Sequence, residues 1–110
     1  MKKSGVNQEF PFDKKTMVFK LCGKMFLLTN IQEWEQYQGR INVKNEPEIN
    51  TLLREQYSSI IPGYHMNKKH WNTINIFEEE LDDDFIFNLI DESYEIIKLK
   101  LPKKDQKTLS

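Results

Sequence analysis

The chain has 110 residues, a length typical of one domain that buries its own hydrophobic core without disulfide bonds. Hydrophobic residues make up 38% of the chain and charged residues 30%, a balance that excludes a disordered protein and favours a globular one. The formal net charge of -1 provides no overall attraction to nucleic acid or to an anionic membrane, so any such binding must come from a local patch.

The chain is expected to begin with a loose polar tail, residues 1–9, followed by a β-hairpin. Residues 16–22 and 24–30 are rich in β-branched, aromatic and aliphatic side chains that alternate as in a strand. Gly23 between these two runs predicts a tight turn.

The next segment, 31–39, fits either a helical turn or an irregular loop. Residues 40–44 then alternate again and predict a third strand. Its outer face carries Arg40, Asn42 and Lys44, so this face is polar and basic.

A first helix is expected to begin at Asn45. Asn45 and Glu48 have the spacing of a capping box, and Pro47 fits the first turn of a helix, where its missing N–H costs nothing. The helix should end near Ser58 or Ser59, before Pro62.

A fourth strand is expected over residues 71–77, and a long helix follows it. The helix has an apolar stripe formed by Leu81, Phe85, Ile86, Leu89, Ile90, Ser93, Tyr94 and Ile97. Asp82, Asp83 and Asp84 at its start match the helix dipole. Pro102 should end the helix and leave residues 103–110 as a frayed tail.

This order of elements predicts an α+β fold of a single domain, residues 1–110. Neighbouring strands joined by tight links favour an antiparallel β-sheet, and two amphipathic helices packed on one face would complete a two-layer sandwich.

Cys22 is the only cysteine, which excludes an internal disulfide and favours a reducing, cytoplasmic location. The first ten residues lack the apolar run of a signal peptide, and no stretch approaches the length of a membrane span. We therefore expect no membrane association.

The stretch PGYHMNKKHWN, residues 62–72, is the densest cluster of functional side chains. His65 and His70 are five residues apart, which is not the spacing of a helical histidine pair, and two ligands do not make a structural metal site. Neither Cys22 nor the serines have the flanking signature of a nucleophile. The sequence thus predicts no metal, no cofactor and no enzymatic activity.

The same stretch is the best candidate for binding an anion. Lys68 and Lys69 supply charge, Asn67 supplies donors and acceptors, and Trp71 with Tyr64 could stack on a base or a sugar. The alternative is an exposed turn in which Trp71 packs at the edge of the core.

Four segments together resemble the MmcQ/YjbR family: FPFDKKTMVFKLCGKMF, INVKNEPEINTLLREQY, IIPGYHMNKKHWNTI and LIDESYEIIKLKLPKK. They cover residues 10–104 in the family's order. The resemblance implies a CyaY-like, frataxin-like fold and a double-wing DNA-binding motif. Family members also have a helix ahead of the FPFD segment, which in this chain is expected to be short or missing.

The leading functional hypothesis is therefore a small cytoplasmic protein that binds DNA without catalysis, as a monomer or a weak homodimer. The predicted nucleic-acid contacts are Asn67, Lys68, Lys69, His70, Trp71, Arg40 and Lys44. One alternative is a protein-interaction module that uses the sheet face. Another is a small-ligand pocket that includes Tyr64 and His65.

Overall fold

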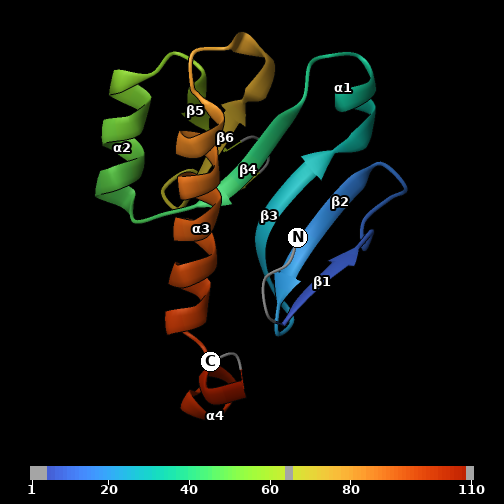
Figure 1. Ribbon diagram of the computed structural model, residues 1–110, viewed down its shortest axis with the longest axis vertical. Helices are drawn as coiled ribbons and strands as arrows, with labels where there is room; N and C mark the ends of the chain where they lie inside the picture. The colour runs from blue at the N-terminus through green and yellow to red at the C-terminus, as the bar shows by residue number, and fades with distance from the viewer. Residues whose placement is uncertain (1–4, 64–65, 109–110) are drawn as a thin grey trace.

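The computed structural model describes residues 5–63 and 66–108. Its centre is one antiparallel sheet of six strands in the spatial order β1-β2-β3-β4-β6-β5 (Figure 1). The strands are β1 (Val6–Glu9), β2 (Thr16–Leu21), β3 (Lys24–Asn30), β4 (Arg40–Lys44), β5 (Ile60–Pro62) and β6 (Trp71–Asn75). The helices are α1 (Ile31–Glu35), α2 (Pro47–Gln56), α3 (Asp83–Leu99) and α4 (Lys103–Thr108), with a 3-10 helix η1 (Ile76–Glu78). The α+β class and the antiparallel sheet are confirmed.

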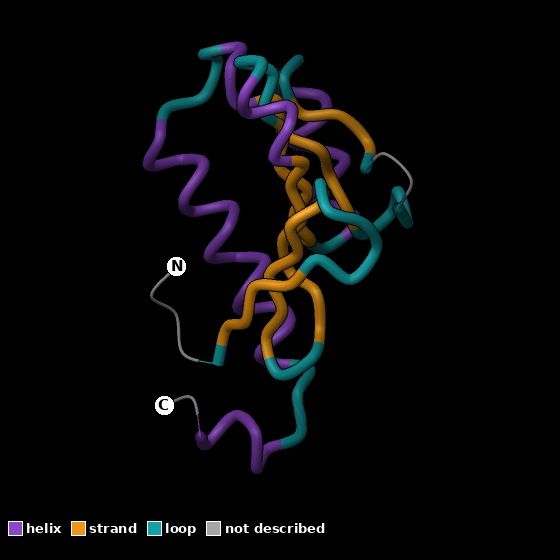
Figure 2. Tube along the Cα trace, turned by 90° about the vertical axis from the view of Figure 1, so that its right-hand side faces the viewer, coloured by secondary structure: helices purple, strands orange, loops and turns teal. Residues whose placement is uncertain are grey.

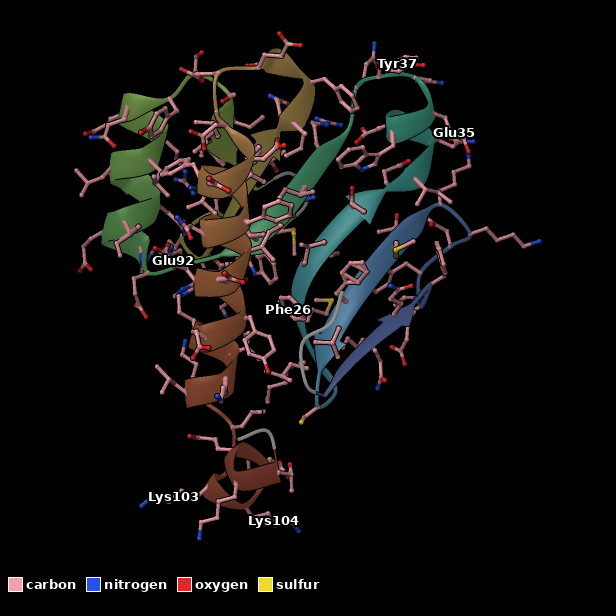
Figure 3. All side chains as sticks on the ribbon, in the orientation of Figure 1. Phe26, Glu35, Tyr37, Glu92, Lys103 and Lys104 are labelled. Carbon is pink, nitrogen blue, oxygen red and sulfur yellow. The ribbon has the colours of Figure 1, made fainter. Side chains whose placement is uncertain are left out.

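Helix α3 covers one face of the sheet and supplies much of the core (Figures 1 and 2). Its buried residues are Ile86, Leu89, Ser93, Tyr94 and Ile97, all of which belong to the predicted apolar stripe. Phe26 of β3 points into the same core (Figure 3). Its ring meets Tyr94 edge to face with centroids 5.6 Å apart. Edge-to-face pairs of this kind stabilise a core beyond the area they bury.

Two polar side chains, Asp82 and Ser93, define where α3 begins and where it joins the sheet. At its start the Asp82 carboxylate accepts the Phe85 N–H at 2.8 Å and caps the helix, in addition to the dipole match expected of the acidic run. In its middle the fully buried Ser93 hydroxyl donates to the Phe26 carbonyl at 2.6 Å and accepts the Lys44 N–H at 2.8 Å. Ser93 therefore joins the helix to two strands.

A bulge in β3 sends apolar side chains to both faces of the sheet. The pairing with β2 skips Phe26, since Leu27 and Met25 have consecutive partners there. As a result Phe26 and Leu27 both join the core beside α3, whereas Met25 and Leu28 pack on the opposite face. The face that α3 leaves uncovered is therefore partly apolar.

Three short elements were not predicted, and two of them correct the expectation of loose ends. Residues 6–9 form β1 and pair with β2, and residues 103–108 form α4. Residues 60–62 form β5 at the other edge of the sheet. Residues 5–9 hold no helix, and residues 1–4 lie outside the described part of the chain. Strands and helices this short show no apolar periodicity from which they could be predicted.

Two residue-level predictions are also wrong. Asn45 does not form a capping box, because the N-cap of α2 is Glu46 and the Asn45 side chain instead bonds the Glu46 N–H and the Glu92 carboxylate. Cys22, the last residue of the strand-like run 16–22, is not part of the strand; it is exposed in the β2–β3 turn with a φ of 47°.

The ambiguous segment 31–39 begins with α1, which Asn30 caps by accepting the Gln32 N–H at 2.9 Å. The strand predicted over 71–77 ends at Asn75, where η1 begins. Across the described residues, every helix is too short or too polar to cross a lipid bilayer.

Candidate functional site

The sheet face opposite α3, called the open face from here on, is bordered by two loops. Residues 10–15 lead into β2 and residues 66–70 lead into β6, and both loops lie on the side away from α3 (Figure 2). A cavity of about 660 Å³ lies at this face, lined by Phe12 from the first loop and by Met66 and Asn67 from the second. This volume is typical of a small-ligand pocket.

The sheet register determines the floor of the cavity. Leu28 of β3 lies opposite Asn42 of β4, and Asn42 lies opposite Thr73 of β6, so these three lining residues form one row. The Thr73 hydroxyl donates to Asn42 Oδ1 at 2.5 Å, and the Asn42 amide donates to the Leu28 carbonyl at 3.4 Å. Both bonds hold the Asn42 amide in one orientation.

The lining changes character on either side of this row. On one side Trp71 is only 7% exposed and packs in a buried cluster with Val18, Leu28 and Met25. On the other side Arg40 forms an ion pair with Glu33. One end of the cavity is therefore apolar, and the other carries two charges that compensate each other.

Helix α2 holds the 66–70 loop through backbone carbonyls. The Arg54 guanidinium donates to the carbonyls of Lys68 and Trp71, the latter at 3.2 Å, and to Asn72 Oδ1 at 2.6 Å. The buried Asn50 amide donates to the Lys69 carbonyl at 3.1 Å. Carbonyls bound to charged and buried donors fix the path of the loop.

The loop also contains its own turn. Asn67 Oδ1 accepts the Lys69 N–H at 3.0 Å, and the Asn67 carbonyl accepts the His70 and Trp71 N–H groups. The side chains of Lys68 and Lys69, called the lysine pair from here on, are exposed on this turn. The motif thus builds a rigid turn that presents two cations.

The predicted contacts fall into two groups. Asn67, Trp71 and Arg40 line the cavity, although Trp71 is buried and Arg40 is paired, so neither is a free surface contact. The lysine pair is exposed on the turn next to Asn67, and the partly buried His70 uses its carbonyl to accept the Asn45 N–H. Tyr64 and His65 lie outside the described residues.

Lys44 does not line the cavity that Asn67, Trp71 and Arg40 line. Among the described residues that line the cavity, Lys44 is absent, although Trp71 opposite it is present. Burial lowers the pKa of its ammonium group, and the nearby charges of Lys100 and Lys24 lower it further. The predicted grouping of Lys44 with the lysine pair therefore gains no support.

Sequence reasoning missed most of the cavity. Asn42 was noted only as a polar strand residue, and Thr73, Met25, Leu28 and Met66 were not considered. A usable signal was the alternation in β4 and β6, which sends Asn42 and Thr73 to the face away from the core. In the described ranges, His, Cys, Asp and Glu side chains form no group of three that could hold a metal ion.

Comparisons with known proteins agree with this architecture. The uncharacterised protein YbdF of Escherichia coli O157:H7 is 38% identical over 99 residues, which span 89% of this chain and 77% of YbdF. The uncharacterised protein YjbR of Escherichia coli K12 is 33% identical over 109 residues, which span 99% of this chain and 89% of YjbR. The crystal structure of Deinococcus radiodurans DR2400, with a DUF419 domain, superposes with a TM-score of 0.86 at 32% identity and covers 98% of this chain and 80% of DR2400.

The model of the YjbR family matches residues 1–96 of the chain. That range contains the whole sheet, the 66–70 loop and helix α2, which holds the loop. The chain therefore belongs to the YjbR family.

Proposed function

We propose that this protein binds DNA through its open face, without catalysis, in the cytoplasm and as a monomer or weak homodimer. The observation that carries the proposal is the lysine pair, because Arg54 and Asn50 hold its turn rigid next to the cavity. Two cations held in a fixed geometry bind phosphate with less loss of side-chain and loop entropy than two on a mobile loop. The exposed thiol of Cys22 suits a reducing compartment.

The distribution of charge supports the same face. The segment from Glu78 to Glu95 contains nine acidic residues and no lysine or arginine, and most of it forms α3 and its approach. The rest of the chain contains 16 basic and eight acidic residues. The net charge of -1 therefore results from a strongly acidic segment around α3 and an excess of basic residues elsewhere. DNA would be repelled from the acidic segment and directed to the open face.

The family resemblance adds support of a different kind. Members of the MmcQ/YjbR family are described as DNA-binding proteins with a double wing. The two loops that border the open face, residues 10–15 and 66–70, are the candidates for such wings here. A frataxin-like sandwich likewise leaves one sheet face available for a partner.

The test is a titration of fluorescein-labelled DNA by fluorescence anisotropy across a range of salt concentrations. The double variant Lys68→Ala/Lys69→Ala should weaken binding and lower the slope of log K against log salt by about two, one unit for each lost phosphate contact. The matched control is Lys103→Ala/Lys104→Ala, which removes the same charge from exposed residues of α4 (Figure 3). Absence of binding at low salt, or equal losses in both variants, would overturn the proposal.

A second candidate function is a protein-interaction module that uses the same face. The apolar end of the cavity favours it, because Met25, Leu28 and Trp71 together offer the kind of surface that protein partners bury. A pull-down from lysate separates the two candidates. A partner that survives nuclease treatment supports the protein interface, whereas loss of all captured material after nuclease treatment supports DNA.

A further inference from the structure

The cavity on the open face has features that phosphate binding by the lysine pair does not require. Its apolar end is lined by Met25, Leu28 and Trp71, and its floor carries the Asn42 amide and the Thr73 hydroxyl. A site for phosphate alone needs cations and N–H donors, not an apolar wall. The cavity therefore suits a ligand group with apolar faces and a polar edge.

Asn42 provides a hydrogen-bonding group in a defined orientation. Its Oδ1 accepts from Thr73 and its nitrogen donates to the Leu28 carbonyl. The amide nitrogen carries two hydrogens, and the bond to Leu28 uses one, so the second can be donated to a ligand. Amide side chains held in this way read the edges of nucleobases.

The charges around the cavity separate a neutral interior from a cationic border. The charged lining residues are Arg40 and Glu33, which pair with each other. The lysine pair directly follows Asn67, which lines the cavity, and is exposed. A neutral ring inside and an anionic group outside is the charge pattern of a nucleotide.

We infer that the cavity takes one unstacked nucleobase of a single DNA strand, whose phosphates then lie along the lysine pair. The inference rests on the proposed function and adds the class of ligand. A base in a duplex is stacked on both sides and cannot enter a cavity, so single strands are favoured. The ring would contact the thioether of Met25 and the edge of Trp71, and such contacts tolerate any base.

Two labelled 12-mers test this inference because they carry the same phosphates. One is oligothymidine, and the other has the same backbone with every base removed. Stacking and edge contacts predict that oligothymidine binds about tenfold more tightly than the abasic strand. Equal affinity for the two strands would overturn the inference.

Variants assign that preference to the cavity. Asn42→Leu keeps the side-chain size but removes the amide. The ratio of affinities for oligothymidine and the abasic strand should therefore fall from about ten towards one. Asn88→Leu, the same change at an exposed position of α3, should leave the preference intact. If Asn42→Leu reduces capture of a protein from lysate but changes neither strand's affinity, the cavity belongs to a protein interface and the inference fails.

A second readout does not depend on how well Asn42→Leu folds. The chain has two tryptophans, and only Trp71 lines the cavity, so Trp34→Phe makes Trp71 the single indole of the chain. Oligothymidine should change Trp71 emission in parallel with anisotropy, and the abasic strand should not. If both strands bind equally and leave the emission unchanged, the base inference fails while DNA binding stands. If neither strand nor a duplex binds at low salt, the proposed function itself fails.

Discussion

Gly63 allows the chain to pass directly over Trp71. A Cβ atom at residue 63 would lie 2.8 Å from the Trp71 Cβ and 3.0 Å from the Trp71 carbonyl oxygen. The Gly63 N–H donates to that same oxygen at 2.9 Å, so the backbone cannot move away without losing the bond. The glycine in the PGYHMNKKHWN motif is thus explained by close packing at the strand entrance.

Gly63→Ala should therefore lower the free energy of unfolding by about 1–3 kcal/mol, because the methyl group meets backbone atoms that cannot yield. Urea unfolding followed by Trp fluorescence measures this loss. Lys68→Ala, at an exposed position of the same motif, should change stability by no more than about 0.5 kcal/mol. Equal stability of the two variants would contradict the packing argument.

Glu80 should make stability depend on pH in the acid range. Its carboxylate accepts the Ser59 hydroxyl at 2.6 Å and the Ser59 N–H at 2.7 Å, and these bonds hold its pKa below the ordinary value of 4.5. A lowered folded-state pKa contributes stability above the ordinary value, and that contribution is lost as the pH falls through the folded-state pKa. The wild-type protein should therefore exceed Glu80→Gln in stability at pH 7 and lose that advantage as the pH falls from about 5 towards 3.

Urea unfolding at several pH values measures that difference, with Glu78→Gln as an exposed control close in sequence. A gap between wild type and Glu80→Gln that stays constant from pH 7 to pH 3 would show that the carboxylate charge is not what Ser59 binds.

At the scale of elements, α2 acts as a brace for the 66–70 loop more than as a cover for the sheet. Its contacts run through Arg54 and Asn50, which together bind the carbonyls of two loop residues, the carbonyl of Trp71 at the start of β6 and the side chain of Asn72. Leu53 adds only a partly buried apolar contact with the core. A helix that holds a loop by polar contacts controls the geometry of whatever that loop presents.

Arg54→Leu should loosen this brace. It leaves the carbonyls of Lys68 and Trp71 without their charged donor, which should cost about 2–3 kcal/mol of stability. It should also speed amide hydrogen exchange at His70 and Trp71. Glu55→Ala, an exposed neighbour on the same helix, should affect neither quantity. A loop that exchanges as slowly in Arg54→Leu as in wild type would exclude the bracing role.

Elements with a strong apolar period could be predicted from the sequence, and polar or very short ones could not. The stripe of α3 and the hairpin at Gly23 are confirmed because burial of one face dictates their patterns. In contrast, β1 is the sequence VNQE, with one apolar residue, and it exists because β2 offers a free edge.

The cavity could not be predicted from the sequence for a related reason. It depends on the register that aligns Leu28, Asn42 and Thr73 across three strands, two of which are far apart in the chain. Residues of the motif were found because they cluster in sequence. Arg54, which holds them, lies 14 residues before Lys68 and has no local signature.

At the scale of the whole molecule, the longest acidic segment and the lysine pair lie on opposite sides of the sheet. The acidic segment from Glu78 to Glu95 belongs largely to the helix layer, and the lysine pair belongs to the opposite side. A protein with a net charge of -1 and an isoelectric point near 6.1 therefore has two distinct electrostatic faces.

Ion-exchange chromatography at pH 7 and low salt should detect both faces. We expect retention on anion-exchange resin and, despite the negative net charge, on cation-exchange resin too. Lys68→Ala/Lys69→Ala should elute earlier than wild type from the cation exchanger but not from the anion exchanger. Asp91→Asn/Glu95→Gln should elute earlier from the anion exchanger but not from the cation exchanger. Flow-through of wild type on the cation exchanger would rule out a functional basic face. These differences should shrink above about 0.15 M salt, where the screening length is about 8 Å.

The two edge strands of the sheet, β1 and β5, limit self-association of the protein. The edge strand β1 is only four residues long and polar, and its Glu9 pairs with Lys20 at 2.8 Å. The opposite edge strand, β5, has three residues and ends in Pro62, which has no N–H to donate to another strand. Edge strands that are short, charged or end in proline discourage strand-to-strand aggregation. The protein can therefore keep one broad sheet face uncovered for a ligand without its backbone becoming a template for fibre growth.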